Sequence, residues 1–490
     1  MMFETMKAVF LKPPVDKAHK NVVRDFIYGC WCNGKRVGGM SLPPTNELLA
    51  ATHARQPGLD VWFLDSQYEV QRYAELTANK FDGTLAVLVM SSTQSFRHDV
   101  GTLKEIKAVN PAVKTILYGS HPTFMPEYCL KEDVVDFIVT REAEETIRCL
   151  LEALLNGESA DEIEGIGYRD ESGKPVINPQ RPFFNMNDLP IPNRSLLPEG
   201  VDYFNPVIRR VPFTTMFTSR GCPARCNYCT APAFYGNKTR VRSADKILEE
   251  LRIVRDLGYR EVFYRDETFS AYKGRNMTVY ESMLGEGMDF TWVANGRVDM
   301  IDREQMKMMK KTGCHLLKFG VETGSQEMLD NYKKGTTIEQ AEETFRLARE
   351  IGIDTHAHII FGGPGETIQT IDQTIDFVTH KLKATTATFG ILTPYAGTEI
   401  FDMVEANHPD ILDGSDSNME NLHTSGFFSE SLCGIPGDVL SRKITEAYRR
   451  FYLRPGYLAE RVLNLKTFDE FMIHSIAGMN VMQFAVSGRK

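Results

Sequence analysis

Short apolar runs separated by stretches with helical spacing make up residues 1–157. Residues 85–90 (LAVLVM) are continuously apolar, as in a parallel strand buried on both faces. Similar patterns predict strands at 7–11, 61–64, 114–118 and 135–139 and helices at 45–56, 97–109 and 142–156. This alternation predicts a doubly wound parallel sheet of Rossmann-like type, whose ligands bind beyond the carboxyl ends of the strands. The expected binding edge consists of the loops 12–19, 91–98 and 119–127.

The rest of the chain divides into three further parts. Residues 158–205 are rich in proline, and we interpret them as a linker with one hairpin around 171–174. In 206–400 the expected strands are 213–218, 261–265, 290–294, 315–321, 355–361 and 386–392, with helices that include 243–257, 302–312 and 338–351. This α/β pattern predicts a partial (β/α)6 barrel, with its chemistry at the carboxyl ends of the strands. Residues 401–490 are expected to be a helical C-terminal domain, with helices at 437–453 and 457–484.

Composition narrows the classes of function. The 490 residues include 56 Lys and Arg against 65 Asp and Glu, and this net charge of −9 argues against general nucleic-acid or membrane-surface binding. No apolar run reaches the roughly 18–20 residues that span a bilayer, and the N-terminus lacks a signal-peptide pattern. We therefore expect a cytoplasmic protein with no transmembrane segment and no nucleic-acid partner. The odd number of cysteines, nine, argues against a disulfide framework.

Three of these cysteines lie close together in the sequence. Cys222, Cys226 and Cys229 have the spacing C-x₃-C-x₂-C, directly after the apolar strand 213–218. Three thiolates on one loop can bind three irons of a [4Fe–4S] cluster and leave the fourth iron for another ligand. The alternatives are a structural zinc site, for which a fourth ligand at the usual spacing is missing, and three cysteines that only pack in the core.

This loop resembles the signature of the radical S-adenosylmethionine (SAM) superfamily, over roughly residues 210–400. The resemblance implies that SAM chelates the open iron and is cleaved to a 5′-deoxyadenosyl radical. It also implies a SAM site in which Tyr228 lies near the adenine and Glu322 and Ser325 lie near the ribose and carboxylate. Further expected SAM contacts follow other strands of the barrel: Asp266, Glu267, Arg297 and His358. For Asp266 and Glu267 the alternative is a solvated acidic loop, and we expect Glu366 to act as an acid at a helix start.

The first domain resembles the cobalamin-binding domain of B12-dependent radical SAM enzymes. The resemblance rests on the loop from Tyr118 to Glu127, on Val135–Phe137 and on Arg141–Glu145. It implies a cobalamin site built from two loops: Ser91, Ser92, Thr93, Gly119, Ser120, His121 and Pro122. The D-x-H-x-x-G motif that supplies histidine to cobalt in B12 mutases is absent, so a purely structural domain is the alternative. Cys30 and Cys32 are unexplained, and we favour a structural or substrate-contact loop there.

Together, these resemblances predict a cobalamin-dependent radical SAM C-methyltransferase with a small-molecule substrate. The expected cofactors are a [4Fe–4S] cluster, SAM and cobalamin, and the expected partner is an external one-electron reductant of the flavodoxin or ferredoxin type. One alternative is a radical SAM cyclase, dehydratase or rearrangement enzyme that transfers no methyl group and acts on a sugar, tetrapyrrole or lipid precursor. Another is a non-catalytic module that senses B12 or redox state through the cluster.

Overall fold

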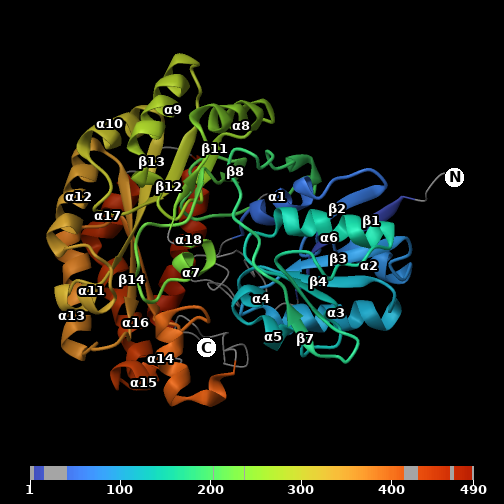
Figure 1. Ribbon diagram of the computed structural model, residues 1–490. Helices are drawn as coiled ribbons and strands as arrows, with labels where there is room; N and C mark the ends of the chain where they lie inside the picture. The colour runs from blue at the N-terminus through green and yellow to red at the C-terminus, as the bar shows by residue number, and fades with distance from the viewer. Residues whose placement is uncertain are drawn as a thin grey trace.

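The structure is a computed structural model that describes residues 5–15, 41–201, 203–236, 238–412, 429–463 and 468–487. Cys30 and Cys32 lie outside these residues. Two large sheets organise the chain, the first from N-terminal and the second from central residues. Figure 1 shows the two parts side by side, with the first sheet in blue and teal and the second in green to orange.

The first sheet has seven strands in the order β2-β1-β3-β4-β5-β6-β7. Its parallel part is β1 (Met6–Lys12), β2 (Leu59–Asp65), β3 (Thr84–Met90), β4 (Lys114–Tyr118) and β5 (Phe137–Val139). The predicted hairpin is present as β6 (Ile166–Arg169) and β7 (Pro175–Ile177), and it extends this sheet with antiparallel pairs. The strand order reverses at β1, which neighbours both β2 and β3, so a ligand is expected beyond the ends of β1 and β3.

Alternate residues of the central strands enter two different cores. In β3, Ala86, Leu88 and Met90 face one core, which includes α1 (Thr45–His53) and α6 (Glu144–Asn156). Val87 and Val89 face the other core, with α2 (Val70–Ala78) and α3 (Phe96–Val109). This period of two explains why the strand is apolar throughout and was predictable as one buried on both faces. Two short helices, α4 (Ser120–Phe124) and α5 (Pro126–Cys129), follow β4.

The second sheet is a six-stranded parallel sheet in the order β15-β14-β13-β12-β11-β8. Its strands are β8 (Phe213–Met216), β11 (Glu261–Tyr264), β12 (Thr291–Gly296), β13 (Cys314–Glu322), β14 (Asp354–Phe361) and β15 (Thr386–Ile391). Connecting helices cover its convex face: α8 (Ala244–Asp256), α9 (Lys273–Gly285), α10 (Arg303–Lys311), α11 (Gln326–Asn331), α12 (Ile338–Ile351) and α13 (Ile368–Asp376). Because β8 and β15 do not pair with each other, the sheet is a partial barrel.

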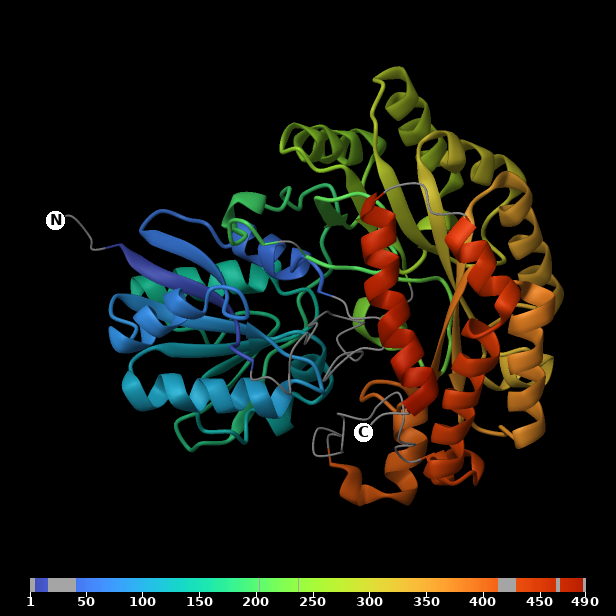
Figure 2. The same cartoon turned by 180° about the vertical axis from the view of Figure 1, so that it is seen from behind.

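The C-terminal helices pack on the last strand of the barrel. They are α14 (Glu399–Asn407), α15 (Ser429–Cys433), α16 (Gly437–Tyr452), α17 (Pro455–Leu463) and α18 (Phe468–Ser487). The hydroxyl of Tyr452 in α16 bonds both backbone groups of Ala387 in β15, at 2.9 and 2.6 Å. Figure 2 shows this helical layer in red from behind. The single helix expected over 457–484 is two helices, α17 and α18. None of the helices in the described ranges has the length and apolarity needed to cross a membrane.

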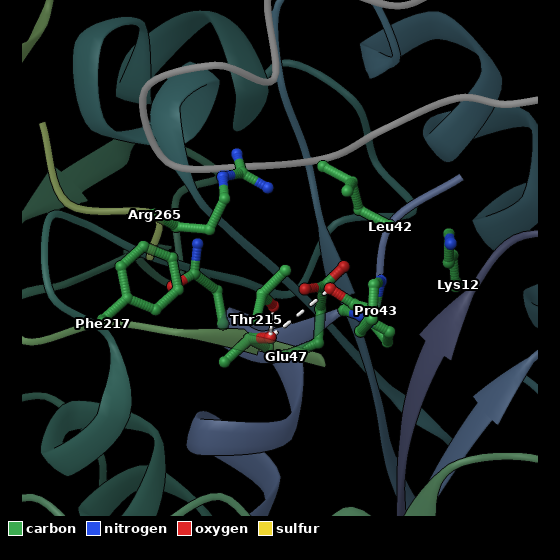
Figure 3. Close-up of a pocket in the computed structure, with 10 residues that line it drawn as sticks. Lys12, Leu42, Pro43, Glu47, Thr215, Phe217 and Arg265 are labelled. Carbon is green, nitrogen blue, oxygen red and sulfur yellow. Dashed lines mark hydrogen bonds between the residues drawn. The ribbon is translucent and has the colours of Figure 1, made fainter. Parts of the chain in front are cut away.

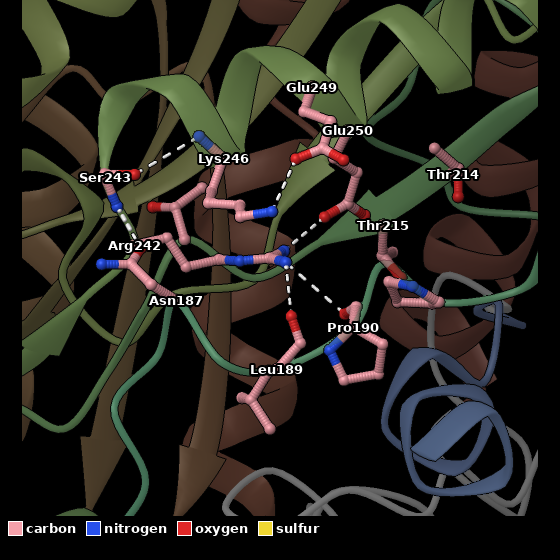
Figure 4. A network of polar contacts seen from close by, with 12 residues as sticks. Asn187, Leu189, Pro190, Thr214, Thr215, Arg242, Ser243, Lys246, Glu249 and Glu250 are labelled. Carbon is pink, nitrogen blue, oxygen red and sulfur yellow. Dashed lines mark hydrogen bonds and ion pairs between the residues drawn. The ribbon is translucent and has the colours of Figure 1, made fainter. Parts of the chain in front are cut away.

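A buried ion network fastens the segment before the barrel onto the barrel. Glu250 in α8 accepts from Arg194 at 2.7 Å and from Arg242 at 2.5 Å, and all three side chains are almost fully buried. Arg242 also donates to the carbonyls of Leu189 and Pro190 (Figure 4). These bonds give residues 187–194 a fixed path between the two sheets.

Candidate active site at the mouth of the barrel

The three cysteines lie on the loop between β8 and α7 (Ala231–Tyr235), at the carboxyl end of the barrel. Cys226 is buried, and Cys222 and Cys229 are partly buried. The amide of Cys229 donates to the carbonyl of Cys226 at 3.2 Å, which closes a tight turn. Burial raises the pKa of the Cys229 thiol, and the nearby Cys226 adds to this shift. The loop therefore gathers three sulfur ligands in a sheltered place.

The acidic pair after β11 holds this loop by its backbone. Asp266 is fully buried and accepts from the amide and hydroxyl of Thr218 and, at 2.6 Å, from the hydroxyl of Ser219. Glu267 accepts from the amide of Gly221 at 3.0 Å. Because the Asp266 carboxylate is committed to the cysteine loop, its geometry gives no support to the expected contact with SAM. Neither residue forms the solvated loop that was the alternative.

Beside the cysteines, a lysine, a glutamate and a tyrosine form a buried triad. Lys334 donates to Glu322 Oε1 at 2.6 Å and to the Tyr228 hydroxyl at 3.2 Å. Tyr228 in turn donates to the same Glu322 oxygen at 3.0 Å. Burial raises the pKa of Tyr228, and the charge of Glu322 raises it further. The triad places the Glu322 carboxylate, whose charge is balanced by Lys334, and the ring of Tyr228 at the cysteine loop.

A backbone irregularity aims Glu322 at this triad. The pairing of β13 with β14 shifts between Gly320 and Glu322, and Glu322 has a φ of 68°. A non-glycine residue in the left-handed region stores backbone strain, which is common where a side chain must be redirected. A Cβ atom at Gly320 would lie 2.3 Å from Glu322 Oε1, so a larger residue there would displace the Glu322 carboxylate from the triad.

The other residues expected near SAM lie around the same mouth. Arg297 is buried, binds Asp299 through two nitrogens at 3.0 and 3.1 Å, and donates to the carbonyl of Lys334 at 2.9 Å. Ser325 caps α11 by accepting from the amide of Met328. Both therefore have internal partners in addition to any ligand they contact.

His358 lies in β14 and has a second histidine, His356, beside it. The two share a face of the strand, because they are two residues apart. Their rings lie 4.5 Å apart, and both bond Thr388 Oγ1, at 3.2 Å from His356 and 2.8 Å from His358. Burial holds the pKa of His356 well below its usual range, with the charge of Lys318 as a second cause.

The predicted cobalamin residues meet at the carboxyl edge of the first sheet. The amide of His121 donates to the carbonyl of Ser91 at 3.3 Å, and Thr93 Oγ1 lies 2.9 Å from His121 Nδ1. Gly119 has a φ of 116°, and a Cβ atom there would lie 2.6 Å from the Ser91 carbonyl oxygen, so only glycine fits. Ser92, Ser120 and Pro122 lie on the same two loops. Two short loops thus form one edge, as the sequence predicts.

This edge and the barrel mouth are in direct contact. Arg220, just before the cysteines, is fully buried and pairs with Glu144 and, at 3.2 Å, with Glu142 at the start of α6. Arg240 also binds Glu142, at 2.6 Å. On the other side, Gln94 donates to the Tyr395 hydroxyl at 3.2 Å. The carboxyl ends of the strands in the two sheets therefore face each other.

Several residues of this site are not marked as site residues by the sequence pattern. Lys334 sits in a polar turn and resembles a solvated lysine. Glu144 belongs to the Arg141–Glu145 segment, which supports the resemblance to a cobalamin-binding domain but predicts no contact with Arg220. No periodic pattern marks them, since their partners are distant in sequence. A charged residue adjoining the cysteine motif is the one signal that points to Arg220.

The donor set suits an iron–sulfur cluster. Among the residues that the structure describes, no three His, Cys, Asp or Glu side chains converge closely enough to hold a single metal ion. A cubane cluster does not require such convergence, because each thiolate binds a different iron. Asp299 raises the pKa of Arg297 and Glu322 raises the pKa of Lys334, and Cys226 lies close enough to add to both shifts. These cations favour thiolates and a negatively charged cluster.

The edge of the first sheet also suits a large polar cofactor. The Ser91 hydroxyl is buried at the end of β3 and has no hydrogen-bond partner in the described part of the chain. Gly119 next to it lets the backbone approach closely. The Ser91 hydroxyl can bond a ligand, and Gly119 leaves room for it. Both lie near the point where the strand order reverses, which is where doubly wound sheets bind their ligands.

A cysteine loop on a partial barrel, opposed to the ligand edge of a Rossmann-like sheet, defines an iron–sulfur enzyme with a second cofactor domain. Comparison with known families agrees. The radical SAM superfamily profile matches residues 216–378, and the B12-binding domain profile matches residues 37–151. The chain belongs to the radical SAM superfamily, in the group that carries an N-terminal B12-binding domain. Its cofactors are accordingly a [4Fe–4S] cluster, SAM and cobalamin.

The similar proteins include some that are named methyltransferases and others that are named cyclases. The uncharacterized methyltransferase PH0819 of Pyrococcus horikoshii is 31% identical over 465 residues, which cover 94% of this chain and 95% of the relative. The anaerobic magnesium-protoporphyrin IX monomethyl ester cyclase of Rubrivivax gelatinosus is 28% identical over 366 residues, covering 73% of this chain and 64% of the cyclase. The cobalamin-dependent SAM radical enzyme OxsB has the same fold, with a TM-score of 0.68, 16% identity, and coverage of 100% of this chain and 74% of OxsB.

Proposed function

We propose that this chain is a C-methyltransferase that adds a methyl group to an unactivated carbon of a small molecule. The observation that carries the proposal is the contact between the two strand-end edges, fixed by Arg220 against Glu142 and Glu144. A methyl donor at one edge and a radical source at the other have to reach the same substrate. This contact is the arrangement that such a reaction needs.

The cofactors supply the reactive groups: SAM on the cluster provides a hydrogen-abstracting radical, and cobalamin carries the methyl group. The chain's own residues orient and shield them. Cys222, Cys226 and Cys229 hold the cluster and leave one iron for SAM. Tyr228 and Glu322, with Lys334, border the expected SAM site, and Arg297 completes it. The loops of Ser91 and Gly119 would hold cobalamin on the opposite edge, which contacts the barrel through Gln94 and Tyr395.

The name of PH0819 supports methyl transfer, since that relative spans nearly the whole chain. The second candidate is a radical cyclisation or other rearrangement without methyl transfer. It is favoured by the similarity to the protoporphyrin ester cyclase, which covers 73% of this chain at 28% identity. Both candidates need an external one-electron reductant of the flavodoxin or ferredoxin type.

The deciding experiment is anaerobic turnover of reconstituted protein with SAM that carries a deuterated methyl group, a reductant and a candidate substrate pool. We expect 5′-deoxyadenosine and a product that is heavier by the labelled methyl group. 5′-Deoxyadenosine with an unlabelled product would support the rearrangement. If no 5′-deoxyadenosine forms with cluster-loaded protein, both proposals fail and a sensing role remains.

A further inference from the structure

A threonine that follows β11 contacts the first of the three cysteines. Thr268 Oγ1 lies 3.3 Å from Cys222 Sγ, and the two groups are hydrogen-bonded. Thr268 is the next residue after Asp266 and Glu267, which bond the residues directly before Cys222. The two segments therefore run side by side in matching order, and the last contact reaches a sulfur atom of the cluster site.

The hydroxyl of Thr268 is committed to this sulfur atom. The side chain is buried, and among the residues that the structure describes its hydroxyl bonds no other group. A buried hydroxyl that loses its partner costs free energy, because it has already lost its bonds to water. The contact with Cys222 is therefore one that Thr268 retains.

The direction of this hydrogen bond follows from the state of the cysteine. While Cys222 is a thiol, either group can donate. A cysteine that binds iron is a thiolate, which has no proton and can only accept. With a cluster on the loop, Thr268 is therefore the donor and Cys222 the acceptor.

Side-chain amides hold the backbone around Thr268 in place. Three carbonyls of this segment accept from them, and the bonds are Asn295 to Asp266 at 2.9 Å, Asn276 to Phe269 at 2.8 Å and Gln305 to Ser270 at 3.0 Å. The ring of Phe269 also stacks on that of Tyr264, with 4.5 Å between the ring centres. Because the segment is already ordered, orienting the hydroxyl toward the sulfur atom costs little conformational entropy.

The strand that leads into the cysteine loop is held as well. In β8, the hydroxyl of Thr215 is hydrogen-bonded to that of Thr45 in α1 (Figure 3). The cavity beside this bond is also lined by Phe217 and Arg265, and its volume of about 20 Å³ leaves room for about one water molecule. The ends of β8 and β11, which lead to Cys222 and Thr268, are therefore closely packed.

A hydrogen bond to a cluster sulfur affects the reduction potential of the cluster. Reduction adds negative charge, part of which lies on the cysteine sulfurs, and a donor stabilises that charge. A hydroxyl donor therefore favours the reduced state. The net free energy of one hydrogen bond corresponds to a change of about two- to tenfold in the ratio of reduced to oxidised cluster.

We propose that Thr268 is a positioning residue of the cluster site, whose hydroxyl donates to the Cys222 thiolate and raises the reduction potential of the [4Fe–4S] cluster. The proposal goes beyond the proposed function, because it concerns the uptake of an electron and not the group that is transferred. It requires a cluster on the cysteine loop, and it holds whether the product is methylated or rearranged.

The test measures the reduction potential of the full-length, reconstituted protein under anaerobic conditions, without SAM or substrate. A titration with redox mediators, followed by visible absorption and electron paramagnetic resonance, gives the ratio of reduced to oxidised cluster at each potential. Thr268→Val keeps the shape of the side chain and removes the hydroxyl. We expect it to lower this ratio about two- to tenfold at a fixed potential. Thr268→Ser keeps the hydroxyl and should titrate like the wild type.

The matched control is Thr312→Val. Thr312 is also buried, and its hydroxyl bonds the carbonyls of Met308 and Met309 at 3.1 and 3.0 Å. It lies between α10 and β13, at the amino end of the barrel strands and therefore opposite the cysteine loop. Thr312→Val loses a buried hydrogen bond too, but its cluster should have the potential of the wild type.

Three outcomes overturn the proposal: the ratio in Thr268→Val is unchanged or higher, Thr268→Ser shifts as far as Thr268→Val, or Thr312→Val shifts equally. If Thr268→Val does not fold or retain iron, Thr268→Ala, which also lacks the hydroxyl, takes its place with the same expectation. The titration contains no SAM and no substrate. A failed methyl-transfer assay therefore refutes the proposed function and leaves this result intact, while an unshifted potential refutes only the role of Thr268.

Discussion

Arg220 and Glu144 form an ion pair that joins two parts of the chain 76 residues apart, with Arg220 Nη1 at 3.3 Å from Glu144 Oε2. Arg220 directly precedes Gly221 and Cys222, while Glu144 begins α6 under the first sheet. Both side chains are inaccessible to solvent. The pair therefore ties the cluster loop to the B12-binding domain, and its loss should affect both stability and coupling.

Arg220→Met removes the cation that Glu142 and Glu144 share, while Glu142 keeps its pair with Arg240. Breaking a buried ion pair from one side costs about 3–5 kcal/mol. We expect a fall of this size in the free energy of unfolding by urea. In the protein that remains folded, more 5′-deoxyadenosine should form per methyl group transferred.

The control is Arg442→Met, which breaks an exposed pair with Asp438 one helical turn away. Exposed pairs contribute about 0–1 kcal/mol. Equal losses in the two variants would contradict a special role for Arg220, and an unchanged product ratio in Arg220→Met would contradict coupling through this contact.

The sequence predicts the strands of both sheets because some runs are continuously apolar, such as 85–90, and others have apolar residues at alternate positions, such as 355–361. The short helices α4 and α5 escape prediction because they have too few residues for a period to appear. α2 escapes because only Leu76 is buried in it. Local pattern therefore predicts elements with a large buried face, and misses those held by a few contacts.

The candidate site likewise contains residues that the sequence reveals and residues that it does not. Cys222, Cys226 and Cys229 are recognisable because their spacing is itself the chemistry. Lys334 is not recognisable, because the bulge at Glu322 that brings it into contact is a feature of strand pairing. Asp266 is recognisable as a residue of the site, but the sequence does not show that Thr218 and Ser219 donate to it.

Asp266→Asn should weaken cluster retention while SAM affinity per cluster stays near that of the wild type. An amide accepts through one oxygen, so the backbone and hydroxyl donors of Thr218 and Ser219 lose part of their acceptor. Iron and sulfide content after anaerobic gel filtration gives the first quantity, and SAM binding per cluster gives the second. A variant with full iron content and weak SAM binding would instead restore the predicted contact of Asp266 with SAM.

Lys334→Met should raise the dissociation constant of SAM at least about tenfold, a loss of about 1.4 kcal/mol. The variant leaves the Glu322 carboxylate buried without its cation and removes the Lys334 donor from the Tyr228 hydroxyl, which still donates to Glu322. Its neighbour Lys333 gives a matched control, because Lys333 is exposed and bonded to Glu399. Lys333→Met should bind SAM like the wild type, and similar affinities of the two variants would refute the triad's role.

Cys226→Ala should abolish 5′-deoxyadenosine formation, because the buried central thiolate of the loop is removed. Iron content and the visible absorption of the reconstituted protein should fall with it. Cys149→Ser is the control, since Cys149 lies on α6 and is distant in sequence from the cysteine loop. Full 5′-deoxyadenosine formation by Cys226→Ala would contradict cluster binding at this loop.

Glu366 makes stability depend on pH. Its carboxyl is buried at the end of β14, with Oε2 lacking a hydrogen-bond partner in the described part of the chain, and burial raises its pKa from 4.5 to about 7. Between these two values the folded chain keeps a proton that the unfolded chain releases, so the contribution of Glu366 to stability is fully present below pH 4.5 and is lost as the pH rises through about 7. The contribution that is lost amounts to about 3 kcal/mol.

Glu366→Gln, which keeps an acceptor for the Thr370 hydroxyl, should lack this loss and be more stable than the wild type at pH 8. Urea unfolding of both proteins across this range measures the difference, and parallel curves would show that Glu366 titrates normally.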